Sequence, residues 1–178
     1  DFFTDKKTLT SSWKGFRVRK TDEYNIKYYL NRNIHKREYG WVSKRQISKN
    51  HASIAPNKVY IPAAGGTGSD SRVLGIPFVG DANSVCSQTY LVIGYDPIKH
   101  NYTVEECENI ASYIRTKFFR YLVSIKKKTQ NGPRGVYQFV PMQDFSKSWT
   151  DEELYKKYNL TEDQIAFIEE MISSMEEE

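Results

Sequence analysis

Short segments with alternating apolar and polar residues dominate the first part of the chain, which is the pattern of β-strands. The clearest are 88–95 and 58–61, and the latter is stopped by Pro62 because proline has no N–H for a sheet ladder. Ser43 lies where it can cap a short helical turn through Ile47. Weaker strand patterns occupy 13–19, 24–30, 41–43, 73–79 and 136–140.

Steps of three or four residues between apolar side chains predict one long helix over about 104–125. Farther along, Thr150 with Glu153 and Thr161 with Gln164 have the spacing of a capping box, so a pair of helices is expected over 150–178. These elements together predict an α+β fold with a mixed, mostly antiparallel sheet. The side chains that form the stripe of the long helix are Cys107, Ile110, Ile114, Phe118, Tyr121 and Ile125.

A length of 178 residues suits one domain, so we expect an α/β domain over 1–149 with 150–178 packed on it as a helical appendage. With 39% hydrophobic residues a sizeable core is expected. No apolar run reaches the roughly 18 residues of a membrane span. The chain begins at Asp1 rather than Met, which indicates a processed chain or a piece of a longer one. Cys86 and Cys107 form no disulfide framework, so reduced thiols and a cytoplasmic location are expected.

The net charge of +4 hides a gradient along the chain. Residues 1–60 carry 14 basic and 5 acidic residues, and residues 61–150 carry 10 and 7. In contrast, residues 151–178 carry 2 basic and 10 acidic residues. A basic body with an acidic end favours a polyanion as the partner of the body.

No catalytic signature accompanies this charge. His35, His51 and His100 are scattered, and neither CxxC nor HExxH occurs. The glycine-rich segment 65–71 lacks the Gly-Lys-Ser/Thr of a phosphate-binding P-loop. A restriction-type nuclease needs acids and a lysine on adjacent strand positions, but the one Asp/Glu-x-Lys, at 5–7, lies outside any strong strand. We therefore predict neither a catalytic residue nor a metal ligand in this chain.

Basic and polar clusters instead predict contacts with DNA. Lysine and arginine neutralise phosphates and release counterions, whereas arginine and glutamine also read base edges. Arg72, Gln88, Gln130 and Arg134 are the candidates for discriminating bases. The full set of predicted contacts is Lys44, Arg45, Lys49, Lys58, Arg72, Ser87, Gln88, Lys126, Lys127, Lys128, Gln130 and Arg134.

Several segments resemble one protein family. SKRQISKN at 43–50, KVYIPAA at 58–64 and YIRTKFFRYLV at 113–123 resemble the C-terminal part of adenine-specific DNA methyltransferases in restriction–modification systems. The same holds for VPMQDF at 140–145 and WTDEELY at 149–155. The resemblance extends over roughly residues 13–172 and involves no catalytic motif. The Asn-Pro-Pro-aromatic loop of that family is missing, since the chain contains no Pro-Pro.

The resemblance implies a target-recognition domain, placed at 1–149, that confers sequence specificity on an N6-adenine methyltransferase or endonuclease. In that family the C-terminal part holds and reads double-stranded DNA, while the N-terminal part carries the catalytic site. The expected partners are therefore double-stranded DNA and the catalytic methyltransferase domain of a parent chain. No cofactor is expected in this fragment; S-adenosylmethionine, and Mg²⁺ where the parent also cleaves, belong to the parent. The fragment alone is expected not to be an enzyme.

Two alternatives remain open from the residues. One is a compact Mg²⁺-dependent nuclease with a divergent site, whose acids come together only in the fold. The other is a protein-interaction module, in which the acidic helices of 151–178 dock onto a partner or back onto the basic body.

Overall fold

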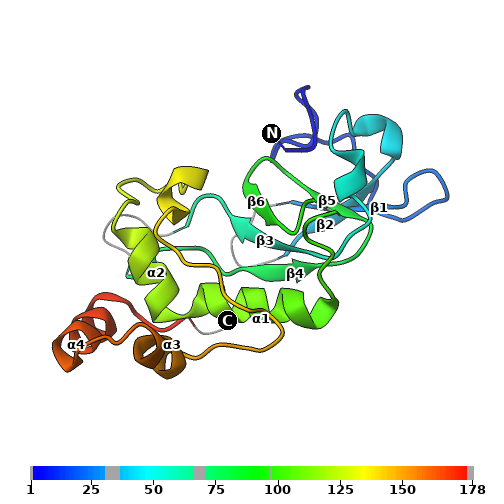
Figure 1. Cartoon of the computed structure of the whole chain (residues 1–178). Helices are drawn as coiled ribbons and strands as arrows, with labels where there is room; N and C mark the ends of the chain where they lie inside the picture. The colour runs from blue at the N-terminus through cyan, green and yellow to red at the C-terminus, as the bar shows by residue number, and fades with distance from the viewer. Residues whose placement is uncertain (1, 31–36, 66–70, 97, 176–178) are drawn as a thin grey trace. The chain divides into compact units, whose positions relative to one another are not determined.

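A computed structural model describes residues 2–30, 37–65, 71–96 and 98–175 and shows an α+β fold (Figure 1). The chain forms two compact units, the first from 1–60 and 79–104 and the second from 61–78 and 105–178. It passes between them inside β3 (Lys58–Pro62) and β4 (Phe78–Gly80), and again at the start of the first helix. The C-terminal helices belong to the second unit together with residues 61–78 and 105–149.

One three-stranded sheet of the first unit is built around β1 (Ile26–Tyr29). β2 (Tyr39–Val42) pairs with β1 in antiparallel register, and β5 (Ser84–Cys86) pairs with its other edge in parallel. Ile26 faces Val42 in this register, and both are buried. Because successive side chains of a strand point to opposite faces, Ile26 and Val42 lie on one face of the β1–β2 pair. The other face carries Lys27 and Trp41 together with Tyr29, which is buried.

A second sheet has the strand order β4-β3-β6, where β6 is Tyr90–Ile93. Val59, Tyr60 and Ile61 of β3 are all buried, as expected of a central strand covered on both faces. The strands expected over 24–30, 41–43, 58–61 and 88–95 thus form, and the one expected over 73–79 begins only at Phe78. β5 was not predicted, because three residues carry too little periodicity.

Two predicted strands are wrong. Within 13–19, the structure shows a single isolated bridge between Arg17 and Trp41. Val136 and Tyr137 instead belong to a 3-10 turn, η3 (Arg134–Tyr137), in which Val136 N–H donates to Pro133 O at 3.0 Å, and residues 138–140 form no strand. The short turn after Ser43 does form, as η1 (Lys44–Gln46), and is followed by η2 (His51–Ser53).

The single long helix predicted over 104–125 is two helices, α1 (Val104–Arg115) and α2 (Lys117–Ser124). Thr116 separates them with an extended backbone, φ −60° and ψ 149°. Its hydroxyl donates to Tyr113 O at 2.7 Å and accepts from Phe119 N–H at 3.2 Å, so one side chain serves the end of α1 and the start of α2. Because the helix is interrupted at Thr116, the three- and four-residue spacing of the apolar side chains no longer keeps all of them on one side. Ile125, the last of them, is 50% exposed.

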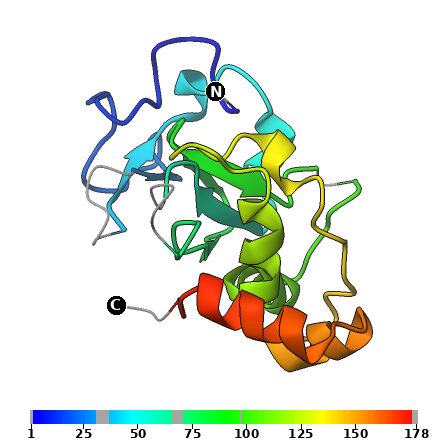
Figure 2. The same ribbon diagram turned by 90° about the vertical axis from the view of Figure 1, so that its left-hand side faces the viewer.

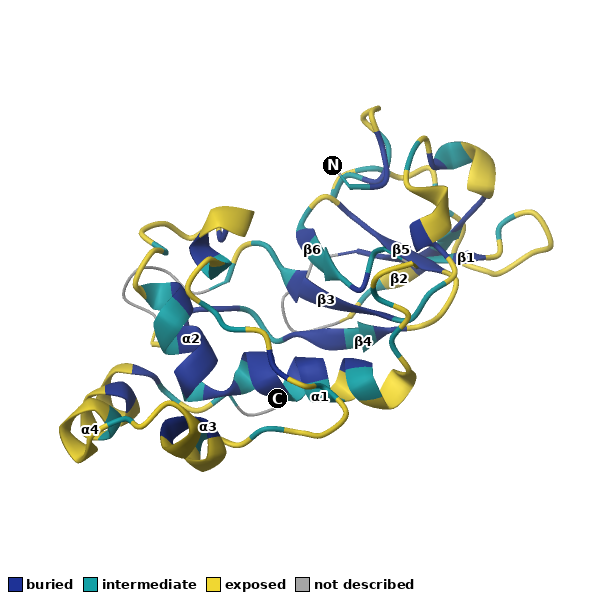
Figure 3. Cartoon of the chain, viewed as in Figure 1, coloured by how far each residue is buried: buried dark blue, intermediate teal, exposed yellow. Residues whose placement is uncertain are grey.

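The predicted helical pair is confirmed as α3 (Asp151–Lys157) and α4 (Glu162–Met171), each with its capping box. Both helices lie beside α2 in the second unit (Figures 1 and 2). Each turns a buried side inward and leaves most of its surface exposed (Figure 3). Among the described residues, no helix is long and apolar enough to cross a membrane.

Candidate nucleic-acid interface

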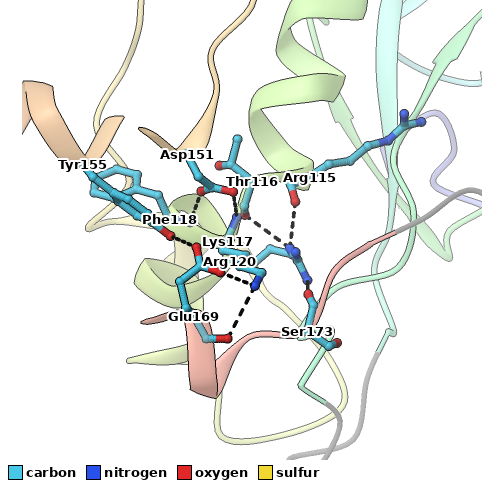
Figure 4. A network of polar contacts seen from close by, with 9 residues as sticks. All are labelled: Arg115, Thr116, Lys117, Phe118, Arg120, Asp151, Tyr155, Glu169 and Ser173. Carbon is cyan, nitrogen blue, oxygen red and sulfur yellow. Dashed lines mark hydrogen bonds and ion pairs between the residues drawn. The ribbon is translucent and has the colours of Figure 1, made fainter. Parts of the chain in front are cut away.

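A buried arginine organises the junction of α1 and α2 (Figure 4). Arg120 is 1% exposed, and its Nε donates to Arg115 O at 3.0 Å. Its Nη1 donates to Ser173 O at 2.8 Å and to Arg72 O at 3.3 Å. The guanidinium therefore joins three separate parts of the second unit: the helix junction, the segment around Arg72 and the end of the chain.

The C-terminal segment also caps α2. The Asp151 carboxylate accepts the N–H groups of Lys117 at 3.0 Å and Phe118 at 2.8 Å (Figure 4). These are unsatisfied donors at a helix N-terminus, where negative charge is favourable. Burial nevertheless raises the pKa of Asp151, and the two hydrogen bonds offset this only in part. Beside it, the hydrogen bond from Lys117 holds the pKa of Glu169 below its ordinary value.

We call residues 125–134, which lead out of α2, the basic loop. It is fixed to residues 63–65 by several hydrogen bonds. Lys127 Nζ donates to Gly65 O at 2.8 Å, and Gly132 N–H donates to Ala63 O at 2.9 Å. Ala64 and Asn131 form an isolated antiparallel bridge between the same segments. The loop is thus held at both its middle and its beginning.

The structure brings five of the predicted contacts together on this loop. Lys126, Lys128, Gln130 and Arg134 are exposed, while Lys127 is half-buried by its bond to Gly65. Lys126 Nζ lies 5.2 Å from the centre of the Phe139 ring. Arg72 is also exposed and belongs to the same unit, where its carbonyl is held by Arg120.

Acidic residues are missing from the sequence around the loop. Between Glu108 and Asp144 the chain has no acid, whereas it has seven cations: Arg115, Lys117, Arg120, Lys126, Lys127, Lys128 and Arg134. Exposed cations without acidic neighbours in the sequence, as Lys126, Lys128 and Arg134 are, favour a positive local potential.

The other predicted contacts belong to the first unit. Lys44 and Arg45 are exposed on η1, and Arg45 Nη1 lies 3.9 Å from Glu23 Oε1. Lys49 is half-buried and pairs with Asp5 at 3.0 Å. Exposed pairs of this kind contribute at most about 1 kcal/mol, so a phosphate can replace the carboxylates. Gln88 is exposed, with its backbone N–H bound to Leu9 O.

Two predicted contacts are wrong because their side chains are buried. Lys58 is 0% exposed, and its Nζ donates to Ile54 O at 2.9 Å, Pro56 O at 2.7 Å and Ser84 O at 3.2 Å. Ser87 is 1% exposed, and its hydroxyl shares a hydrogen bond with Thr89. Both residues hold the first unit together and are unable to reach a ligand.

The sequence analysis missed a surface of the first unit, which we call the aromatic face. It consists of Arg17, Lys20, Tyr24, Lys27, Tyr39 and Trp41, which pair as cations over rings. Arg17 pairs with Trp41 in an isolated bridge, and Trp41 faces Lys27 in the β1–β2 register. The signal was present in the sequence, since Tyr39 and Trp41 are two residues apart on one face of a strand, but the pairing with Arg17 comes only from the fold.

Across the part of the chain that the structure describes, no group of three or more His, Cys, Asp or Glu is placed to hold a metal ion. Cys86 and Cys107 are both buried and form no disulfide, and burial raises the pKa of the Cys86 thiol far above its ordinary value.

Comparison with known proteins identifies no relative: no protein-family model, no curated protein and no solved structure matches this chain. Function is therefore inferred from the interface itself.

Proposed function

We propose that this chain is a sequence-specific DNA-binding domain, the target-recognition part of a restriction–modification N6-adenine methyltransferase or endonuclease. Its catalytic parts, with the S-adenosylmethionine site and any Mg²⁺ site, belong to the rest of a longer parent protein in the cytoplasm. The fragment binds the DNA duplex and leaves covalent chemistry to that catalytic domain.

The observation that carries the proposal is the basic loop. Three exposed cations, Lys126, Lys128 and Arg134, stand on a segment that hydrogen bonds hold to residues 63–65, in a stretch of sequence with no acid. A fixed cluster of cations binds a phosphate backbone with less loss of conformational entropy than a free loop does. Arg134 and Gln130 on the loop, with Arg72 and Gln88 elsewhere, are the side chains suited to read base edges.

The contacts of the C-terminal segment support a structural role for the acidic helices rather than a separate docking module. Asp151 caps α2, and Ser173 O accepts a bond from the buried Arg120. Lys117 pairs with Glu169 across the same junction. These bonds are made within the second unit, so the acidic helices stabilise the α2 that leads into the basic loop.

The proposal is tested by titrating the full chain with a labelled DNA duplex at a series of salt concentrations. If the domain neutralises about four to six phosphates, the logarithm of the affinity falls with the logarithm of the salt concentration with a slope of roughly −4 to −5. A random-sequence duplex gives the non-specific reference. Absence of any salt-dependent duplex binding, also after fusion to a catalytic methyltransferase half, contradicts the proposal.

A further inference from the structure

The aromatic face lies on the side of the β1–β2 pair that carries Lys27 and Trp41, beside Tyr29, whose ring is buried against that of Tyr60. On the opposite side of these strands, Tyr28 and Val42 are fully buried. Tyr39, in contrast, is 52% exposed, and its ring meets that of Trp41 edge to face at a centroid distance of 6.3 Å. Two aromatic rings are therefore held at right angles on a surface that solvent reaches.

Cations are interleaved with these rings. Lys27 Nζ lies 4.2 Å from the centre of the Tyr39 ring, and Lys20 Nζ lies 5.3 Å from that of Trp41. Arg17 stands over Tyr24 at 5.1 Å. Lys27 Nζ also lies 5.4 Å from the centre of the Tyr29 ring, so four cation–ring pairs lie between Arg17 and Trp41.

Lys27 is held in place by a second partner. It forms an ion pair with Asp81, which also accepts a hydrogen bond from the Tyr29 hydroxyl at 3.0 Å. The bond from Lys27 lowers the pKa of Asp81, so the carboxylate stays charged near neutral pH. Because its ion pair with Asp81 holds the Lys27 ammonium in place, the cation–π contact of that ammonium also holds the Tyr39 ring.

The Trp149 ring, which lies outside the aromatic face, differs from the Tyr39 ring in how far it is covered. Two ammonium groups cover the Trp149 ring, Lys147 at 4.0 Å and Lys157 at 4.2 Å, and its indole N–H is bound to Asp144 O. Among the residues that the structure describes, one cation, Lys27, lies over the Tyr39 ring, and Tyr39 is 52% exposed. Trp149 is an internally satisfied ring, whereas Tyr39 offers ring surface to a partner.

Charge identifies the class of partner. The described residues of 13–29 and 37–45 contain eight cations and three acids. Aromatic rings interleaved with cations are suited to single-stranded nucleic acid, since bases stack on the rings and phosphates pair with the cations. A base inside a duplex has both faces covered by its neighbours, so only an unpaired base can stack on Tyr39.

We propose that the aromatic face binds an unpaired stretch of nucleic acid, with a base stacked on Tyr39 and adjoining phosphates on Arg17 and Lys20. This inference rests on the proposed function in that both take nucleic acid as the ligand. It assigns single-stranded nucleic acid to the first unit, whereas the proposed function assigns duplex DNA to the basic loop of the second unit.

The test measures the affinity of the full chain for a labelled oligothymidylate of about 12 nucleotides, a length within known single-strand site sizes. Tyr39→Ala is expected to weaken this binding roughly tenfold to a hundredfold, as loss of one stacked base does, with little change in duplex binding. Tyr39→Phe keeps the ring and is expected to bind within about twofold of the natural chain. The matched control is Phe167→Ala, which removes a ring of similar exposure from the acidic α4 and is expected to change neither affinity.

Three results would overturn the inference: no binding of oligothymidylate by the natural chain, unchanged binding by a folded Tyr39→Ala variant, or equal loss of single-strand and duplex binding in that variant. Competition by polyglutamate as effective as that of the oligonucleotide would also overturn it, because charge alone would then explain the face. Failure of duplex binding in the natural chain counts against the proposed function instead, and the two failures are therefore distinct.

Discussion

At the scale of single residues, the fold decides which cations are available to a ligand. Lys58 and Lys126 are the same residue type, but one donates to three carbonyls in the interior and the other is exposed on a loop. Sequence patterns place Lys58 at the start of a strand without showing that Ile54, Pro56 and Ser84 direct their carbonyls to one point. Burial of a charge is a property of the assembled fold, and it is tolerated here because every ammonium proton has an acceptor.

Replacing Lys58 with Met tests this assignment. The variant keeps an unbranched side chain but removes the three hydrogen bonds from the Lys58 ammonium, so we expect the free energy of unfolding to fall by about 2–3 kcal/mol. Lys44→Met, on exposed η1, is the control and is expected to stay within about 0.5 kcal/mol. Both are measured by urea denaturation. A Lys58→Met variant as stable as the control would show that the three hydrogen bonds contribute little.

At the scale of elements, the strongest sequence patterns predict strands and helices well where one periodicity continues without interruption. The C-terminal helices and β3 follow this rule, because capping boxes and Pro62 mark their ends. The break at Thr116 was missed, since threonine is compatible with a helix and the Asp151 carboxylate, which caps the start of α2, comes close to it only in the fold. The aromatic face was missed for a similar reason, because the bridge from Arg17 to Trp41 joins segments far apart in sequence.

Two carboxylates at the start of α2 are expected to affect stability with opposite pH dependence. Burial raises the pKa of Asp151 in the folded state, so the protonated side chain stabilises the fold. This contribution to the free energy of unfolding is lost as the pH rises through the folded-state pKa of Asp151. The pKa of Glu169 is lowered by Lys117, so its contribution is present at neutral pH and is lost as the pH falls through the folded value.

Thermal unfolding of Asp151→Asn and Glu169→Gln between about pH 3 and pH 7 measures both effects. The stability difference between the natural chain and Glu169→Gln is expected to shrink toward acid pH. For Asp151→Asn the difference is expected to grow toward acid pH, because the natural side chain is then neutral and keeps its oxygens on Lys117 and Phe118. Parallel pH profiles for the two variants would contradict these assignments.

At the scale of the whole molecule, the acidic and the basic residues of the charge gradient lie on different elements. The acidic residues of 151–175 lie on helices that support α2, while the cations of the basic loop remain exposed in the same unit. Charge and composition alone predict a polyanion partner, and the resemblance predicts DNA. The structure adds which cations are exposed, and it removes Lys58 and Ser87 from the proposed contacts.

The most direct test of the account is the salt dependence of duplex binding when the basic loop loses its three exposed cations. A variant with Lys126→Ala, Lys128→Ala and Arg134→Ala is compared with a control in which Lys99→Ala and Lys156→Ala remove exposed cations elsewhere. If the loop binds phosphates, the salt slope of the loop variant falls in magnitude by about 2–3 and its affinity drops, while the control keeps the natural slope. A loop variant with the slope and affinity of the natural chain would contradict the account.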